Sequence, residues 1–259
     1  MHGLIARVKR RKFLFEELVK RDFRQKYKRT LLGMGWSILN PLLTLLILYA
    51  VFGFFFGKQI EHFTIYLFCG NVLFAYFQEA TSGGMSALVA NARIFTKVNI
   101  PKYLFLLSRN VSSIINFALT LVIFFIFIIM EPGLYFNCYY IALLFPIGCL
   151  IIFNIGVGMV LSALYIFFRD IMHLYNVFLR LLVYASAIFY PVDMLPADIQ
   201  QYFFVNPVYC YIYYFRSIVL YNTLPSFGLH MLCLGYASIA ILLGMFIYKR
   251  YNHEFLYYV

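Results

Sequence analysis

The residues around position 36 separate a strongly basic segment from a long apolar one. The first 36 residues contain eleven Lys or Arg, whereas Leu42 to Phe56 contains no charged residue. An uncharged apolar run of about 20 residues can cross the roughly 30 Å hydrocarbon core of a bilayer as a helix. This run begins near residue 37, too late and too long for a cleavable signal peptide. The boundary therefore predicts a retained membrane span behind a basic flank.

The composition agrees with lipid as part of the solvent. Of the 259 residues, 64% are hydrophobic and 12% are charged, about half the charged fraction of soluble domains. The formal net charge is +11, but the basic residues lie mostly beside apolar runs, where they set topology and meet anionic lipid. No basic and aromatic platform for single strands is present. We therefore expect membrane lipid, and no nucleic acid, as a partner.

The apolar runs predict an all-α integral membrane protein with one domain, residues 1–259. It would comprise a cytoplasmic or interfacial segment (1–36), a six-span bundle (37–248) and a cytoplasmic tail (249–259). Helices satisfy the backbone in lipid, and the alternation of an outer-membrane barrel is absent. The six expected spans are 37–57, 64–84, 108–130, 139–164, 172–190 and 229–248.

The distribution of Lys and Arg predicts the orientation. Eighteen of these residues lie on one side, in the N-terminal flank, the 85–109 connection, the turn after the fourth span and the tail. Lys58 and Arg216 lie on the opposite side, and Arg180 interrupts the fifth span. The positive-inside rule then places both termini in the cytoplasm.

Residues 12–30 have the pattern of an amphipathic helix. Phe15, Val19, Phe23 and Tyr27 recur every four residues, opposite a face of Lys12, Glu16, Lys20, Arg24 and Lys28. Such a helix would lie flat on an anionic leaflet. The alternative is an ordinary basic flank without a helix. We expect the helix, because the two stripes share one period.

Residues 191–228 are apolar and rich in Tyr, but four prolines divide them. Asn206-Pro207 is a favourable helix start, with Asn as N-cap and Pro in the first turn. Pieces this short cannot cross a bilayer. The pattern predicts two short re-entrant helices at the outer face, between the fifth and sixth spans.

The sequence lacks the motifs of an enzyme or an ATPase. It contains no G-x-x-x-x-G-K-S/T, H-E-x-x-H or G-x-S-x-G motif, so we expect no cofactor on this chain and no P-loop. A membrane enzyme acting on a lipid-linked sugar remains an alternative, with Asp170, Asp193 and Asp198 as its candidate acids or bases. A disulfide between Cys138 and Cys210 is also left open.

Charges in spans mark candidate functional positions. Glu79 and Arg180 could form a buried pair or contact a phosphate headgroup, or they could extend to the bilayer surface. Aromatic side chains suit sugars, which have apolar C–H faces and a hydroxyl rim; helix packing is the alternative role. The aromatic residues that we expect in a substrate channel are Tyr49, Phe52, Phe56, Tyr184, Phe189 and Tyr190.

Small residues offer a further structural indication. Gly158-x-x-x-Ser162 and Ala240-x-x-x-Gly244 permit close approach of helices in a membrane.

Four motifs in one order resemble a known family. They are Leu32-Gly33-x-Gly35-Trp36 with Asn40-Pro41-Leu42, then Phe95-Thr96-Lys97-Val98-Asn99-Ile100-Pro101-Lys102, then Phe168-Arg169-Asp170-Ile171 with Ile188-Phe189-Tyr190-Pro191, then Asn206-Pro207 with Tyr214-Phe215-Arg216. Together they resemble ABC exporter permeases for O-antigen, capsular polysaccharide and teichoic acid. The sequence departs from the family at Ala185-Ser186-Ala187-Ile188, where the family commonly has Ser-Pro-Ile and a bend.

The resemblance implies a homodimeric permease in the bacterial cytoplasmic membrane, driven by a separate ABC ATPase that binds ATP and Mg. Its substrate would be a polyprenyl-diphosphate-linked glycan, with the first and fifth spans of two protomers lining the channel. An ABC permease for a drug or small lipid is the alternative. The ATPase would dock on the 91–102 loop through Arg93, Phe95, Lys97 and Pro101. A separate hypothesis, which rests on charge and not on the resemblance, is that Arg24, Lys28, Arg29 and Arg180 contact the diphosphate or a headgroup; the alternative is that these charges only hold lipid.

Overall fold

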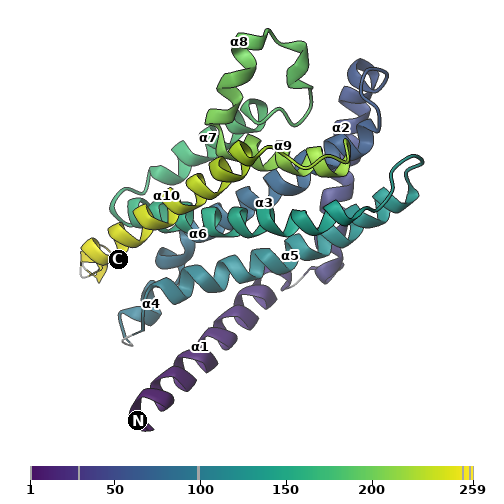
Figure 1. The fold of residues 1–259 in the computed structure, drawn as a ribbon. Helices are drawn as coiled ribbons and strands as arrows, with labels where there is room; N and C mark the ends of the chain where they lie inside the picture. Colours follow the sequence, from purple (N-terminus) through teal and green to yellow (C-terminus); the bar gives the residue numbers. More distant parts are fainter. Residues whose placement is uncertain (1, 29, 98–99, 253, 257, 259) are drawn as a thin grey trace.

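The computed structural model describes residues 2–28, 30–97, 100–252, 254–256 and 258, and in these it contains helices and no strand (Figure 1). The α-helices are α1 His2–Tyr27, α2 Trp36–Phe56, α3 Phe63–Ala90, α4 Ala92–Phe95, α5 Tyr103–Met130, α6 Leu144–Phe167, α7 Ile171–Ala185, α8 Ala197–Gln200, α9 Pro207–Val219 and α10 Phe227–Tyr251. The 3-10 helices are η1 Gly33–Gly35, η2 Cys138–Leu143, η3 Val192–Met194, η4 Gln201–Val205 and η5 Glu254–Leu256.

Helix α6 is the centre of the bundle, because it packs against both α3 and α10. A Cβ added to Gly84 would lie 3.0 Å from the Cα of Gly158, and one added to Gly244 would lie 2.8 Å from the Cβ of Met159. These contacts leave no room for a larger side chain. The structure therefore confirms that small residues allow close helix packing here.

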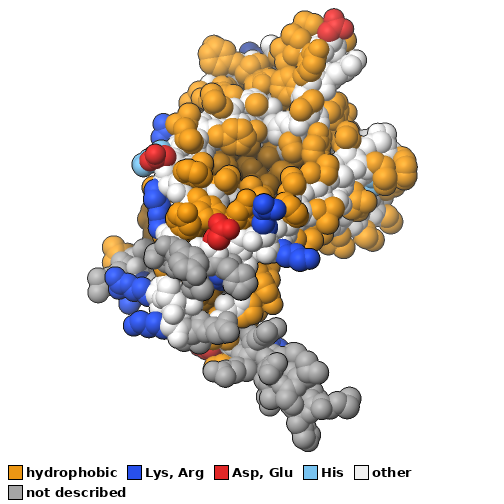
Figure 2. All heavy atoms as spheres, turned by 90° about the vertical axis from the view of Figure 1, so that its left-hand side faces the viewer, with side chains coloured by type: hydrophobic (Ala, Val, Ile, Leu, Met, Phe, Trp, Pro, Cys, Tyr) orange, Lys and Arg blue, Asp and Glu red, His pale blue; other side chains and the backbone are white. Residues whose placement is uncertain are grey.

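The loops of the bundle gather at two ends. Helix α4, the α6–α7 turn and the C-terminus lie together at what we term the α4 end (Figure 1). The opposite end, which we term the far end, holds the α2–α3 and α5–η2 connections, where His62 Nδ1 and Glu131 Oε1 are 3.0 Å apart. Figure 2 shows hydrophobic side chains over the upper part of one face and Lys and Arg in its lower half.

Four helical segments are long and apolar enough to cross a membrane: Gly33–Phe56, Tyr103–Met130, Cys138–Phe167 and Phe227–Tyr251. These correspond to the first, third, fourth and sixth expected spans. Helix α3 is a 28-residue helix at the second position, but it is not among these four. Helix α7 has 15 residues, about 22 Å at 1.5 Å per residue, so α7 alone covers only part of the roughly 30 Å hydrocarbon core. The fifth segment thus ends at Ala185, not at residue 190 as predicted.

The amphipathic helix is present and longer than expected, since α1 begins at His2 and ends at Tyr27. Its polar stripe from Lys12 to Lys28 is exposed. The opposite face packs against α5, with Leu18 buried. Asp22 is 1% exposed; it accepts from Arg21 at 2.7 Å and from Ser108 at 2.7 Å. These contacts join α1 to α5.

The proline-divided segment folds into η3, α8, η4 and α9. Asn206 is the N-cap of α9, as predicted: its Oδ1 accepts from the Val208 amide at 3.0 Å, and Pro207 begins the helix. Its Nδ2 also donates to the Ala185 carbonyl at 3.1 Å, so one residue caps two helices. The five cysteines are free, including Cys138, which is exposed, and Cys210, which is buried.

Candidate functional site

Three of the predicted channel aromatics meet where α2 approaches the end of α7. The rings of Phe52 and Phe189 are stacked, with centroids 4.7 Å apart and planes 3° apart. Tyr184 packs edge-on against Phe189, with centroids 5.7 Å apart. We term Phe52, Tyr184 and Phe189 the aromatic cluster. It joins segments more than 130 residues apart in sequence.

The other predicted aromatics lie around this cluster. The Tyr190 hydroxyl donates to the Tyr184 carbonyl at 2.8 Å. Tyr49 packs on Phe63, with centroids 6.3 Å apart, and Phe56 is partly buried near the end of α2. The structure thus brings Tyr190 to the cluster and leaves Tyr49 and Phe56 outside it.

Helices α2 and α7 each leave an apolar stripe uncovered. On α7 the exposed residues recur at helical spacing, and on α2 most large side chains are exposed. They are Leu174, Val177, Phe178, Leu181 and Tyr184 on α7, and Ile38, Leu43, Leu46, Ile47, Tyr49, Val51, Phe54 and Phe55 on α2. An apolar surface of this extent requires cover by lipid or by another protein.

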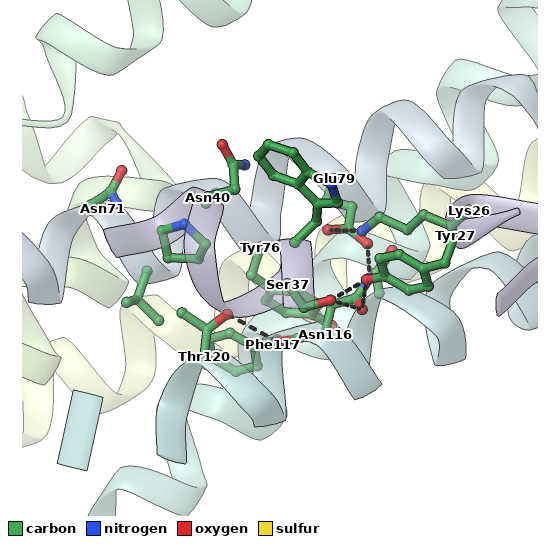
Figure 3. Close-up of a pocket in the computed structure, with 15 residues that line it drawn as sticks. Lys26, Tyr27, Ser37, Asn40, Asn71, Tyr76, Glu79, Asn116, Phe117 and Thr120 are labelled. Atoms are coloured by element: carbon green, nitrogen blue, oxygen red, sulfur yellow. Dashed lines mark hydrogen bonds and ion pairs between the residues drawn. The ribbon is translucent and has the colours of Figure 1, made fainter. Parts of the chain in front are cut away.

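A polar cavity lies between the start of α2 and helices α3 and α5 (Figure 3). Its volume is about 280 Å³, and Trp36, Asn40 and Pro41 of the α2 motif line it. Pro41 has no N–H, so the Ser37 carbonyl lacks its intrahelical donor. Gly33, with φ +51°, and Gly35 belong to the short connection between α1 and α2. The motif thus shapes one wall of the cavity.

A continuous polar network crosses the cavity wall (Figure 3). Lys26 Nζ lies 2.9 Å from Glu79 Oε2, and Asn116 Nδ2 donates to Glu79 Oε1 at 2.7 Å. Asn116 Oδ1 accepts from the hydroxyls of Tyr27 at 2.6 Å and Ser37 at 3.1 Å. We term these five residues the inner network. It connects α1, α2, α3 and α5 through side chains alone.

Sequence reasoning marked Glu79 but missed the other members of this network. Ser112, Ser113, Asn116 and Thr120 interrupt the apolar α5 at helical spacing. That polar stripe was the available signal, since polar side chains inside membrane helices usually face one another.

The predicted headgroup contacts lie on separate elements. Arg24 is exposed on α1, Lys28 is exposed directly after α1, Arg180 is exposed on α7, and Arg29 lies outside the described residues. None of the three described residues forms an ion pair with another described side chain.

The predicted ATPase-docking segment is partly internal. Arg93 and Lys97 are exposed and Pro101 is partly buried, but Phe95 is 5% exposed and packs on Phe105. In this structure Phe95 offers almost no surface to a partner.

Lys102 joins this segment to the C-terminal tail. Its ammonium donates to the Asn252 carbonyl and lies 5.3 Å from the ring centroid of Phe255. Burial lowers the pKa of Lys102.

The remaining motif residues lie in the α6–α7 turn and in the segment that follows α7. The Arg169 guanidinium lies 5.3 Å from the Tyr165 ring centroid. Asp170 is exposed, as are Asp193 and Asp198, the other candidates for a membrane enzyme. Pro191 has extended backbone and precedes η3.

Comparison with known proteins finds one family and several relatives of similar length. The family described as ABC-2 type transporter matches residues 14–220. The O-antigen export system permease protein RfbA of Klebsiella pneumoniae is 28% identical over 249 residues, 94% of this chain and 95% of the relative. RfbA of Myxococcus xanthus is 26% identical over 82% of each chain. The polysialic acid transport protein KpsM of Escherichia coli is 23% identical over 91% of each.

Proposed function

The chain belongs to the ABC-2 type transporter family, and on that premise we propose that it is the permease subunit of an ATP-driven exporter of a lipid-linked glycan. The observation that carries the proposal is similarity along nearly the whole chain to permeases for O-antigen and polysialic acid. The apolar helices and the family make it a multi-pass membrane protein. We place it in the bacterial cytoplasmic membrane with six crossings and both termini inside.

The proposed path for the glycan runs along α2 and α7. Their uncovered apolar stripes would face the same helices of a second copy, so that a homodimer encloses the passage. Within the aromatic cluster, Tyr184 is 62% exposed and would offer its ring to the C–H surfaces of sugars and its hydroxyl for hydrogen bonds, while Phe52 and Phe189, stacked on each other, would form the wall behind it. Helices η3, α8, η4 and α9 would shape the exit at the outer face.

The proposed partner is a separate ABC ATPase at the α4 end. Arg93 and Lys97 are exposed there, and they suit an acidic groove on that subunit. Movement of α4 would reach the membrane helices directly, because Phe95 packs on Phe105 of α5. Helix α1 would move together with α5, because Asp22 joins the two helices.

The proposed substrate carries a diphosphate, which charge-assisted hydrogen bonds from Arg24, Lys28 and Arg29 at the inner surface would bind. Arg180, exposed on α7, is a further candidate contact along the path. Replacing Arg24 and Lys28 together by Gln should weaken binding of a polyprenyl-diphosphate lipid more than binding of the corresponding monophosphate. Equal weakening of the binding of both lipids would show that Arg24 and Lys28 do not contact the diphosphate.

Deleting the gene tests the proposed function in cells. A cell-surface glycan should disappear while its lipid-linked precursor accumulates inside, because synthesis continues without export. Loss of the precursor itself would instead indicate a membrane enzyme. An unchanged glycan surface combined with sensitivity to drugs would indicate a small-molecule exporter.

A further inference from the structure

A buried arginine lies beside the end of α7. Arg216 on α9 is 4% exposed. Its guanidinium donates to three main-chain carbonyls: Ala187 at 2.9 Å, Ile188 at 3.0 Å and Tyr66 at 3.2 Å. It also lies 3.5 Å from the centroid of the Tyr66 ring. One side chain thus binds the backbone that follows α7 to the first turn of α3.

The chemistry of this position explains why a guanidinium is suitable. The Ala187 and Ile188 carbonyls lie beyond the last turn of α7, and burial of both residues keeps water from replacing a missing donor. Arginine has five N–H donors in one plane and can serve several carbonyls at once. A cation also interacts favourably with the C-terminal end of a helix. Arg216 therefore donates to carbonyls that burial separates from water.

The backbone that Arg216 binds is strained. Ala187 has φ +48° and is fully buried. Glycine usually occupies this left-handed position after a helix, because the Cβ of other residues is crowded there. Such a conformation persists only when surrounding contacts impose it. The bonds to the Ala187 and Ile188 carbonyls impose it, so the chain turns after α7 without the proline that the family commonly has.

Helix α3 provides the space for this contact. A Cβ added to Gly70 would lie 2.9 Å from Nη2 of Arg216 and 3.3 Å from the Cα of Ile188. Gly83, on the same helix, has nothing within 4 Å of the corresponding position. Gly70 and Gly83 therefore form a matched pair, in which only one glycine supports the arginine.

We propose that Arg216 is a positioning residue: it fixes residues 186–190 against α3, so that Phe189 lies on Phe52. The ring of Phe189 follows directly after the carbonyls that Arg216 binds. The importance of this contact for glycan passage rests on the proposed function. The role of Arg216 in placing Phe189 does not rest on the proposed function, because it is inferred only from the hydrogen bonds of Arg216.

Cross-linking tests the proposal without a substrate. Cysteines at positions 52 and 189 are introduced into the full-length chain with Cys138→Ser, because the other four native cysteines are buried. A short bifunctional thiol reagent should join them. Replacing both rings removes their stack, so the link then reports the main-chain position that Arg216 sets. Cysteines at Lys26 and Glu79, whose side chains are 38% and 36% exposed and whose charged groups are 2.9 Å apart, give a remote reference link between α1 and α3.

Arg216→Lys should lower the 52–189 link about tenfold, which corresponds to about 1.4 kcal/mol, while the reference link stays unchanged. Gly70→Ala should have the same effect, and Gly83→Ala none. Adding Ala187→Gly to Arg216→Lys should restore much of the link, because glycine adopts the turn without strain. A general loss of folding would lower both links, and adding Ala187→Gly would not restore them.

Unchanged 52–189 linking in Arg216→Lys and Gly70→Ala would overturn the proposal, as would equal loss of both links. If Arg216→Lys does not accumulate, the two glycine variants decide the question. Surface glycan is measured in the same cells. Normal links in a wild-type chain that exports no glycan would refute the proposed function and leave the role of Arg216 intact.

Discussion

The inner network and the Arg216 contact both place a cation beside α3, but in opposite environments. The Lys26 and Glu79 side chains are 38% and 36% exposed, and their ion pair borders a cavity. Arg216 is 4% exposed and binds only main-chain carbonyls. The first contact joins side chains that water or a headgroup could replace. The second donates to buried main-chain carbonyls that water does not reach.

This difference indicates where the molecule can move. A partly exposed ion pair contributes little to stability and separates at small cost. A buried cation whose removal leaves several carbonyls unpaired is costly to displace. We therefore expect α1 and the start of α2 to shift during transport while the end of α7 stays fixed on α3. The cavity beside the inner network is where that shift would be accommodated.

The largest expected effect comes from breaking the fixed contact. Arg216→Met should lower the free energy of unfolding by about 3 kcal/mol or more, because three buried carbonyls lose a charged donor. Thermal unfolding in detergent measures the loss. Arg250→Met, at an exposed residue of the last turn of α10, is the control and should change stability by less than about 0.5 kcal/mol. A similar loss of stability in Arg216→Met and Arg250→Met would show that the buried Arg216 contact is not a fixed one.

Replacing Asn116, whose amide is at the centre of the inner network, should cause the second largest loss of stability. Asn116 is 5% exposed and serves Glu79, Tyr27 and Ser37, so Asn116→Leu should cost about 1–2 kcal/mol. Ala118→Leu, on the exposed face of the same helix, should be close to neutral. A neutral Asn116→Leu would mean that the network does not stabilise the junction of α1 and α2.

The ion pair itself should have a smaller effect on stability. A double-mutant cycle with Lys26→Met and Glu79→Gln should give a coupling of about 0.2–1 kcal/mol that falls as salt is added. A coupling above about 3 kcal/mol that is insensitive to salt would show that this contact is as fixed as that of Arg216.

The smallest effect concerns Lys102 and the C-terminal tail. Burial lowers the pKa of Lys102 in the folded chain, so the unfolded chain binds more protons between that lowered pKa and the ordinary value of about 10.4. Stability should therefore rise with pH across this window. Limited proteolysis of the tail measures it, with Lys102→Met as the variant in which the rise is absent. An identical pH profile in both proteins would contradict the assignment.

Apolar runs, caps and small residues were sufficient to predict much of the fold. Local rules placed the start of α9 at Asn206-Pro207, the helix in the basic flank and the close contact around Gly158 and Gly244. The hydrophobic pattern extended the fifth segment to residue 190, because Ile188 and Phe189 are apolar. It carried no signal for the left-handed turn at Ala187, since alanine seldom adopts it.

The contacts that distinguish the two regions could not be predicted, because they join residues far apart in sequence. Lys26 pairs with Glu79, and Arg216 binds Ala187, Ile188 and Tyr66. Arg216 was assigned to the outer side as an ordinary topological charge, and Phe95 to an exposed loop. Both are buried, because neighbouring helices cover them.

Transport by reconstituted vesicles tests whether this chain moves a lipid-linked glycan at the expense of ATP. The purified chain, with or without the proposed ABC ATPase partner, is placed in liposomes that contain a polyprenyl-diphosphate-linked glycan. We expect the glycan to cross the bilayer only when the chain, the ATPase and ATP are all present. Passage of the glycan through the chain alone, or no passage with the complete complex and ATP, would contradict it.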